Sequence, residues 1–150
     1  MSLRAITVCV LCLLSWHSAS AQDRGFEPIV TAFFAQLQAG ESDTAVNTLF
    51  ASSPWSGEMT RDLQQVKDQL RLVGSNAGRL VGYYPIAEAN VAGRYVRVEY
   101  MGAYERQSFR FSFTFYKPEE QWYVDKFGFQ YDLDDYLSQR TQLEITVPDF

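Results

Sequence analysis

The spacing of apolar residues changes once along the chain, at the sequence GSNAG, from the period of a helix to that of a strand. A first helix is predicted around residues 30–37, where four apolar residues share one face. A second, short helix is predicted to begin near Ser42 or Asp43, either of which can act as its N-cap. A third, longer helix is predicted from Glu58 to about Val73, ended by GSNAG. The face residues are Val30, Phe33, Phe34 and Leu37, then Val46, Leu49 and Phe50, then Met59, Leu63, Val66, Leu70 and Val73.

After GSNAG the apolar residues alternate with polar ones, which is typical of strands with one buried face. We predict four strands, with turns at VAGR and KPEEQ. In the third strand a phenylalanine occupies every second position from Phe109 to Phe115. The predicted strands span residues 79–90, 94–103, 107–117 and 121–130.

The pattern also predicts a register for the second and third strands. They are expected to pair about a tight connection near Tyr104 and Glu105. The resulting pairs are Val96–Phe113, Val98–Phe111, Tyr100–Phe109, Glu99–Arg110 and Arg97–Ser112. A slip of one residue would bury Arg97 and Glu99 against phenyl rings, so the alternation favours this register. The phenylalanines are therefore predicted to form a core under the three helices.

The first 21 residues have the pattern of a secretory signal peptide. Arg4 provides a positive start, residues 5–16 are an apolar run, and Ala19 and Ala21 are the small residues of a cleavage site. The run is shorter than the roughly 20 residues that span a membrane as a helix. We therefore expect cleavage after Ala21 and export to the periplasm or the exterior. The mature residues 22–150 are long enough for one domain core.

Cleavage would remove both cysteines, Cys9 and Cys12, together with His17, the single histidine. The mature chain then has no cysteine or histidine to serve as nucleophile, catalytic base or zinc ligand, and no disulfide. We expect no metal and no cofactor. The acidic cluster at Asp132, Asp134 and Asp135 lacks the spacing of a calcium loop and predicts the first turn of a short C-terminal helix.

The charge of the chain argues against nucleic acid as a partner. Its net charge is −5, which becomes −6 once Arg4 is removed, and no run of lysine or arginine occurs. A protein that binds nucleic acid needs a basic surface to neutralise phosphates. The remaining expected partners are a small apolar ligand or another protein, with no membrane span.

Three helices, the last of them long, followed by an antiparallel meander resemble the NTF2-like group, the cystatin-like α+β cone. The resemblance, closest to small exported bacterial members, rests on FFAQLQAGESDTAVNTLF for the first helix pair and FRFSFTFYKPEEQWYVDKFGF for the last hairpin. It implies three N-terminal helices packed on a curved four-stranded antiparallel sheet, with a short C-terminal helix. The chain lacks the strand pair that fuller members place before the long helix. The group includes isomerases, dehydratases and non-enzymatic binding modules, so the fold does not select a reaction.

The resemblance also implies a pocket between the helices and the sheet. Four large residues could line its mouth or simply complete the core: Trp55, Tyr84, Tyr100 and Trp122. For an isomerase or lyase, a carboxylate must lie beside a tyrosine in apolar surroundings, and Asp125 is the candidate. The inward-facing residues of its strand change from even positions, Trp122 and Val124, to odd positions, Phe127 and Phe129, which predicts a bulge near Asp125 and Lys126. This bulge could equally be exposed and without function.

The sheet face opposite the phenylalanines is predicted to be charged and hydroxylic. Its residues are Tyr95, Arg97, Glu99, Arg110, Ser112, Thr114 and Tyr116. The face could be ordinary solvated surface with one Glu99–Arg110 ion pair. Tyrosine and arginine are, however, enriched at interfaces, and the resemblance implies dimers through this side of the sheet. We therefore predict an exported, non-catalytic binding or interaction module, with a homodimer or partner contact centred on Arg97, Glu99 and Arg110. The alternative is a small lyase or isomerase that uses Asp125.

Overall fold

The computed structural model describes residues 24–146, with side chains from residue 24 to residue 141. Three helices precede a four-stranded antiparallel sheet, and one helix follows it. The predicted fold class is confirmed, while the predicted signal peptide lies outside the described residues. The elements are α1 Glu27–Gln38, α2 Ser42–Phe50, α3 Thr60–Ala77, β1 Leu80–Val91, β2 Tyr95–Tyr104, β3 Ser108–Tyr116, β4 Tyr123–Gln130 and α4 Leu133–Thr146.

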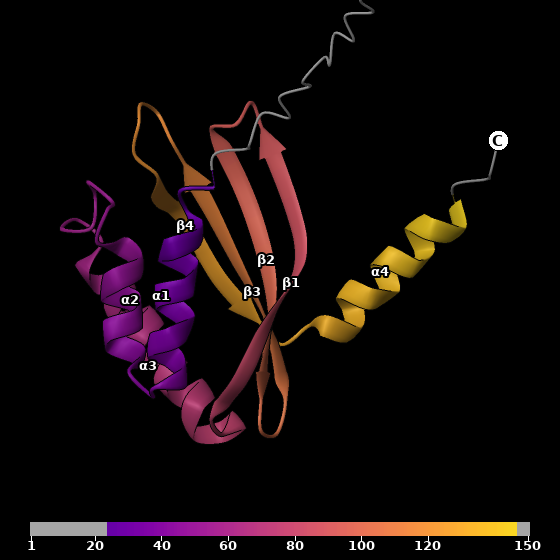
Figure 1. Cartoon of the computed structure of the whole chain (residues 1–150). Coiled ribbons are helices and arrows are strands. Elements are labelled where there is room, and N and C mark those ends of the chain that lie inside the picture. Colours follow the sequence, from indigo (N-terminus) through magenta and orange to yellow (C-terminus); the bar gives the residue numbers. More distant parts are fainter. Residues whose placement is uncertain (1–23, 147–150) are drawn as a thin grey trace, which may run out of the picture.

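The sheet is a meander in which each strand pairs with the next along the chain, in the order β1-β2-β3-β4. Helices α1 to α3 lie on one side of it, and α4 extends away on the other side (Figure 1). Within residues 24–146 no helix is long and apolar enough to cross a membrane. The sheet therefore has an inner face, toward α1 to α3, and an outer face, toward the start of α4.

The predicted faces of β2 and β3 are confirmed, but the predicted register is wrong by two residues. Val98 pairs with Phe113 instead of Phe111, and the other pairs shift likewise, so that Arg97 meets Thr114, Glu99 meets Ser112 and Arg110 meets Met101. The reason is the position of the connection between the two strands. It was predicted near Tyr104 and Glu105, but β2 continues to Tyr104 and β3 begins at Ser108, and the Tyr104 amide donates to the Gln107 carbonyl at 3.0 Å. A turn placed one residue later along the chain shifts every pair by two residues. A shift of two residues leaves every side chain on its face, so apolar alternation does not detect it.

Helix α3 begins two residues later than predicted and extends four residues further, to Ala77. Gly74 is thus helical, although glycine is a poor helix former. The fully buried Ala77 explains the extension, because continued helix carries this residue into the core. The helix ends at Gly78, whose φ of +85° is a backbone conformation that residues with a Cβ rarely adopt.

Aromatic rings from α1 and β3 form the centre of the core. Phe33 and Phe34 of α1 meet Phe111 and Phe113 of β3, and none of the four is exposed. The ring centroids are 5.3 Å apart for Phe33–Phe113 and 5.4 Å for Phe34–Phe111, both edge to face. On β2, a Cβ at Gly102 would lie 2.6 Å from a ring carbon of Phe111, so a glycine is needed there. The rings occupy the space under the helices, as the sequence predicted.

Candidate functional site

The interior expected to hold a pocket is filled by stacked rings. Tyr100 lies on the inner face, with its ring centroid 5.5 Å from that of Phe34 and 6.0 Å from that of Tyr83. Phe34 and Tyr83 stack on one another at 4.2 Å. Burial raises the pKa of Tyr100 above its ordinary value. Tyr100 thus packs against the rings of Phe34 and Tyr83 on the inner face and is itself partly buried.

The structure does not bring the four predicted pocket residues together. Trp55 and Tyr84 are 56% and 53% exposed, the first in the loop between α2 and α3 and the second on β1 opposite Met101. Trp122 is buried, with its ring 5.4 Å from that of Phe26 in an edge contact. Its indole nitrogen has no hydrogen-bond partner in the described part of the chain. Tyr100 and Trp122 complete the core, while Trp55 and Tyr84 are surface residues.

Asp125 lies in the predicted bulge, but outside the apolar interior. Thr114 pairs with Lys126 and Phe115 with Val124, which leaves Asp125 as the extra residue. Its exposed carboxylate accepts a hydrogen bond of 2.8 Å from the Tyr95 hydroxyl. This bond is the main cause that raises the pKa of Tyr95. The carboxylate and tyrosine required by the isomerase hypothesis are therefore paired, but on the solvated outer face.

An ion-pair network centred on Arg110 holds one end of the outer face. The Arg110 guanidinium donates to Glu99 Oε1 at 3.2 Å, to Asp132 Oδ1 at 3.0 Å and to Gln130 Oε1 at 2.8 Å. Asp132 is the main cause that raises the pKa of Arg110, and Arg110 in turn lowers the pKa of Asp132. The side chains of Arg110 and Glu99 are only 15% and 10% exposed. The predicted Glu99–Arg110 pair exists, but it is largely buried rather than a surface pair.

The first residues of α4 cover this end of the outer face. The Arg110 guanidinium carbon lies 5.5 Å from the centre of the Tyr136 ring. The Tyr136 hydroxyl donates to the Ile86 carbonyl of β1 at 3.3 Å. The predicted interface residues Glu99 and Arg110 therefore lie beside the start of α4, and the interface stays a prediction.

The opposite end of the outer face is uncovered and carries a row of tyrosines. Tyr95, Tyr116 and Tyr123 lie on three adjacent strands, with ring centroids 6.1 Å and 5.7 Å apart. Arg97 lies beside the row with its side chain 53% exposed, and one of its guanidinium nitrogens is 2.8 Å from Glu99 Oε1. We call the residues Tyr95, Arg97, Tyr116, Tyr123, Asp125 and Lys126 the open patch.

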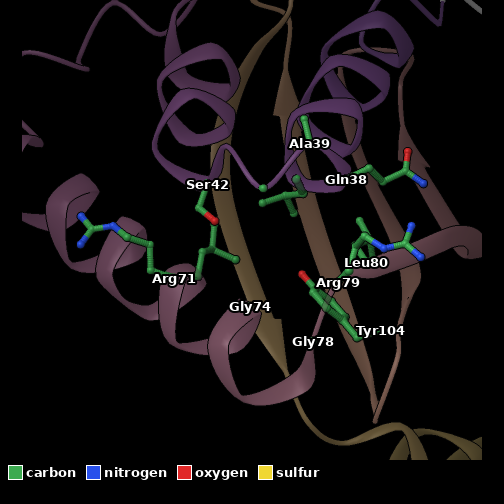
Figure 2. A pocket seen from close by; sticks show the side chains of 12 residues that line it. Gln38, Ala39, Ser42, Arg71, Gly74, Gly78, Arg79, Leu80 and Tyr104 are labelled. Carbon is green, nitrogen blue, oxygen red and sulfur yellow. The ribbon is translucent and has the colours of Figure 1, made fainter.

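A separate hollow, here called the corner pocket, lies where the α1–α2 loop, the end of α3, the start of β1 and the end of β2 meet. Its volume is about 410 Å³, and its lining includes Leu37, Ser42, Leu70, Leu80 and Tyr104. Figure 2 shows the hydroxyl groups of Ser42 and Tyr104 turned into this space. Sequence analysis missed the pocket because its lining comes from four segments and because the α3 end was misplaced.

Metal ligands do not cluster in the described part of the chain. Between residues 24 and 141, no three side chains of aspartate, glutamate, histidine or cysteine are grouped so that they could hold a metal ion.

Comparison with known proteins supports the fold and nothing finer. No family model matches the chain, and no curated protein matches it. The structure is similar to that of a Campylobacter jejuni protein described as a candidate NTF2-like transpeptidase, with a TM-score of 0.50 and 13% sequence identity. The match covers 65% of this chain and 94% of that one. At this identity the likeness shows that the chain has an NTF2-like α+β fold.

Proposed function

We propose that this protein is an exported, non-catalytic interaction module of NTF2-like type, which binds a second copy of itself through the open patch. The observation that carries the proposal is the row of Tyr95, Tyr116 and Tyr123 beside Arg97 on an uncovered part of the sheet. Tyrosine and arginine are the residue types enriched at protein interfaces, and they supply much of the binding energy there.

Apart from Lys126, the side chains of the open patch make contacts within the chain before any partner binds. The Tyr95 hydroxyl donates to Asp125, and Arg97 is held by Glu99. Tyr116 lies between the rings of its two neighbours on paired strands. Ordering of flexible side chains opposes association, so a patch that is already ordered binds at a lower entropic cost.

The charges of the open patch suit contact with a second copy. Arg97 and Lys126 are positive and Asp125 is negative, and all three are exposed. In a two-fold dimer the same surface meets itself, so a positive group of one copy can face a negative group of the other. A patch that carries both signs is in this sense complementary to itself.

A non-catalytic role is supported by the filled interior and by the exposure of Asp125. A carboxylate base of the isomerase type needs apolar surroundings that raise its pKa, and Asp125 lies in solvent. The name of the similar Campylobacter jejuni protein suggests a transpeptidase instead. Residues 22–150 contain no cysteine or histidine, so that reaction would need a nucleophile and a base of other types.

The export part of the proposal rests on the first 21 residues of the sequence. N-terminal sequencing of protein recovered from the producing cells tests it. We expect the mature chain to begin at Gln22. A chain that begins at Met1, or at a lipidated Cys12, would contradict export by cleavage after Ala21.

Sedimentation velocity of residues 22–150 at micromolar concentration tests self-association. We expect a dimer for the wild type and about tenfold weaker association for Arg97→Glu, because the reversal places like charges in the contact. The matched control is Arg61→Glu, a reversal at an exposed position of α3, which should leave the dimer unchanged. A monomeric wild type, or equal weakening by both variants, would contradict the proposal.

A further inference from the structure

We propose that the corner pocket binds a medium-chain aliphatic carboxylate, a molecule with an unbranched tail of about eight carbons and one carboxylate group. This site is distinct from the ring-filled interior and from the open patch. The proposal therefore stands or falls independently of self-association.

The pocket has an apolar floor suited to an alkyl chain. Leu37, Leu70 and Leu80 contribute to its lining and are 7%, 1% and 1% exposed, so they belong to the core and are firmly held. The volume of about 410 Å³ lies near the lower end of the range of about 300–1,000 Å³ found for small-molecule sites. Lining residues such as Gln38 and Gly40 are exposed, so solvent reaches the pocket from one side.

Two hydroxyl groups can bind the polar end of the ligand. Tyr104 comes from the end of β2 and Ser42 from the start of α2, and both point into the pocket (Figure 2). The Tyr104 ring is fixed by an edge contact with Phe109, at 5.6 Å between centroids. Burial raises the pKa of Tyr104 to about 12, so its hydroxyl stays protonated at neutral pH and can donate a hydrogen bond. A ligand with an acceptor at its polar end satisfies both groups.

The lining itself carries two positive charges, those of Arg71 and Arg79, and no negative one, although both arginines are paired with carboxylates outside the lining. Arg71 is turned away from the pocket in Figure 2 and is bound by Asp43 at 2.9 Å. Arg79 is 67% exposed and is held more loosely, at 3.6 Å from Glu105. A modest movement of Arg79 would bring a positive charge toward a bound carboxylate.

Gly74 offers a way to close the pocket without disturbing the core. It lines the pocket, and a Cβ built there would meet no atom within 4 Å outside its own helix turn. Because Gly74 is helical, alanine at this position favours the helix. A leucine at this lining position adds a bulky side chain beside the space proposed for the alkyl chain. Gly74→Ala is therefore the matched control for Gly74→Leu.

The test uses residues 22–150 labelled with ¹⁵N and titrated with octanoate, octanol and octylamine in NMR spectra. With octanoate we expect saturable shifts that fit one site, largest at the amides of Gly40, Gly74 and Gly78. Octanol should bind more weakly, and octylamine should cause no saturable shift. Gly74→Ala should bind octanoate as the wild type does, while Gly74→Leu should lose binding. Tyr104→Phe, which removes one donor and keeps the ring, should bind about five- to tenfold more weakly.

Three results would overturn the proposal. The first is the absence of saturable shifts at millimolar octanoate. The second is octylamine or octanol binding as tightly as octanoate, which would rule out recognition of the carboxylate. The third is unchanged binding by Gly74→Leu and by Tyr104→Phe, which would place the ligand elsewhere. Tyr104→Phe keeps the test decisive if Gly74→Leu does not fold, because it retains the ring and the edge contact of that ring with Phe109.

Discussion

The inner and outer faces of β2 and β3 are built by alternate residues of the same two strands, yet they differ in charge and in the kind of contact that holds their side chains. On the inner face, Phe111 and Phe113 are fully buried among other rings. On the outer face, Arg110 and Glu99 are held by charged hydrogen bonds, and Tyr116 remains 37% exposed. The same two strands thus supply core packing on one face and polar contacts on the other, because successive side chains of a strand point to opposite faces.

The two faces should also respond differently to substitution. The inner contacts depend on filled volume, so the removal of one ring leaves a cavity that the neighbouring side chains close only in part. The outer contacts depend on direction and charge, and water replaces many of them when they are lost. Large effects on stability are therefore expected at inner positions, and effects on association at outer ones.

The largest expected effect is that of Phe111→Ala. It should lower the free energy of unfolding by about 3–5 kcal/mol, the usual cost of emptying a large buried aromatic site. Native domains are stable by about 5–15 kcal/mol, so this variant could lie close to unfolding. Urea denaturation measures the loss. The control on the opposite face is Tyr116→Ala, which should cost less than about 1 kcal/mol; equal losses would erase the distinction between the two faces.

A smaller loss is expected when the buried network of the outer face is broken. Glu99→Gln removes the negative charge that Arg97 and Arg110 share, at a side chain that is 10% exposed. We expect a loss of about 1–3 kcal/mol in urea denaturation, the typical cost of leaving a charged hydrogen-bonding group without its partner. Glu119→Gln, an exposed position in the β3–β4 loop, is the control. If both variants are as stable as the wild type, the network does not hold the face.

The Asp132–Arg110 contact should make stability depend on acid pH. Arg110 lowers the pKa of Asp132 below its ordinary value of 3.8 in the folded protein. The resulting stabilisation is fully present above the unfolded pKa and is lost as the pH falls through the folded pKa. Wild type should therefore be more stable than Asp132→Asn at neutral pH, and the gap should narrow below about pH 4. Urea midpoints across the pH range measure it, and a constant gap would contradict the linkage.

The smallest effect is expected at the bulge. Asp125→Asn weakens a single hydrogen bond to Tyr95 between two exposed side chains. Such surface contacts contribute at most about 1 kcal/mol, so the fold should remain, and self-association should weaken only slightly through the loss of this negative charge from the open patch. Circular dichroism melting and sedimentation velocity check both. An enzymatic activity that this variant abolished without unfolding would instead move the lyase or isomerase alternative to first place.

The comparison of the two faces also explains what the sequence could and could not predict. The spacing of apolar residues is a local property, with one period in helices and another in strands. The helices, the strands, both sheet faces and the bulge at Asp125 could therefore be predicted from it. The register could not, because it depends on the hairpin end, where the Arg106 amide donates to the Ala77 carbonyl from another element. The environment of Arg110 was missed for the same reason, since Tyr136 belongs to α4.

The corner pocket illustrates a second limit. Four of its lining residues, Leu37, Leu70, Leu80 and Tyr104, are apolar or aromatic and read individually as core. A hollow arises only where the segments that carry them fail to fill the space between them. Gly40 and Gly74 mark that place, because neither has a side chain and a Cβ at either would meet open space. Both glycines were interpreted from the sequence as markers of helix ends, so their place in the wall of a cavity was not recognised.

The central claim, that the outer sheet face is the interaction surface, is tested most directly by cross-linking. Residues 22–150 contain no cysteine, so one can be introduced alone at Lys126 in the open patch. Treatment of Lys126→Cys with a short bis-maleimide should give a covalent dimer. The same reagent should leave Leu72→Cys, at an exposed position of α3 that is 60% accessible, monomeric. A monomeric Lys126→Cys, or equal cross-linking of the two variants, would contradict the claim.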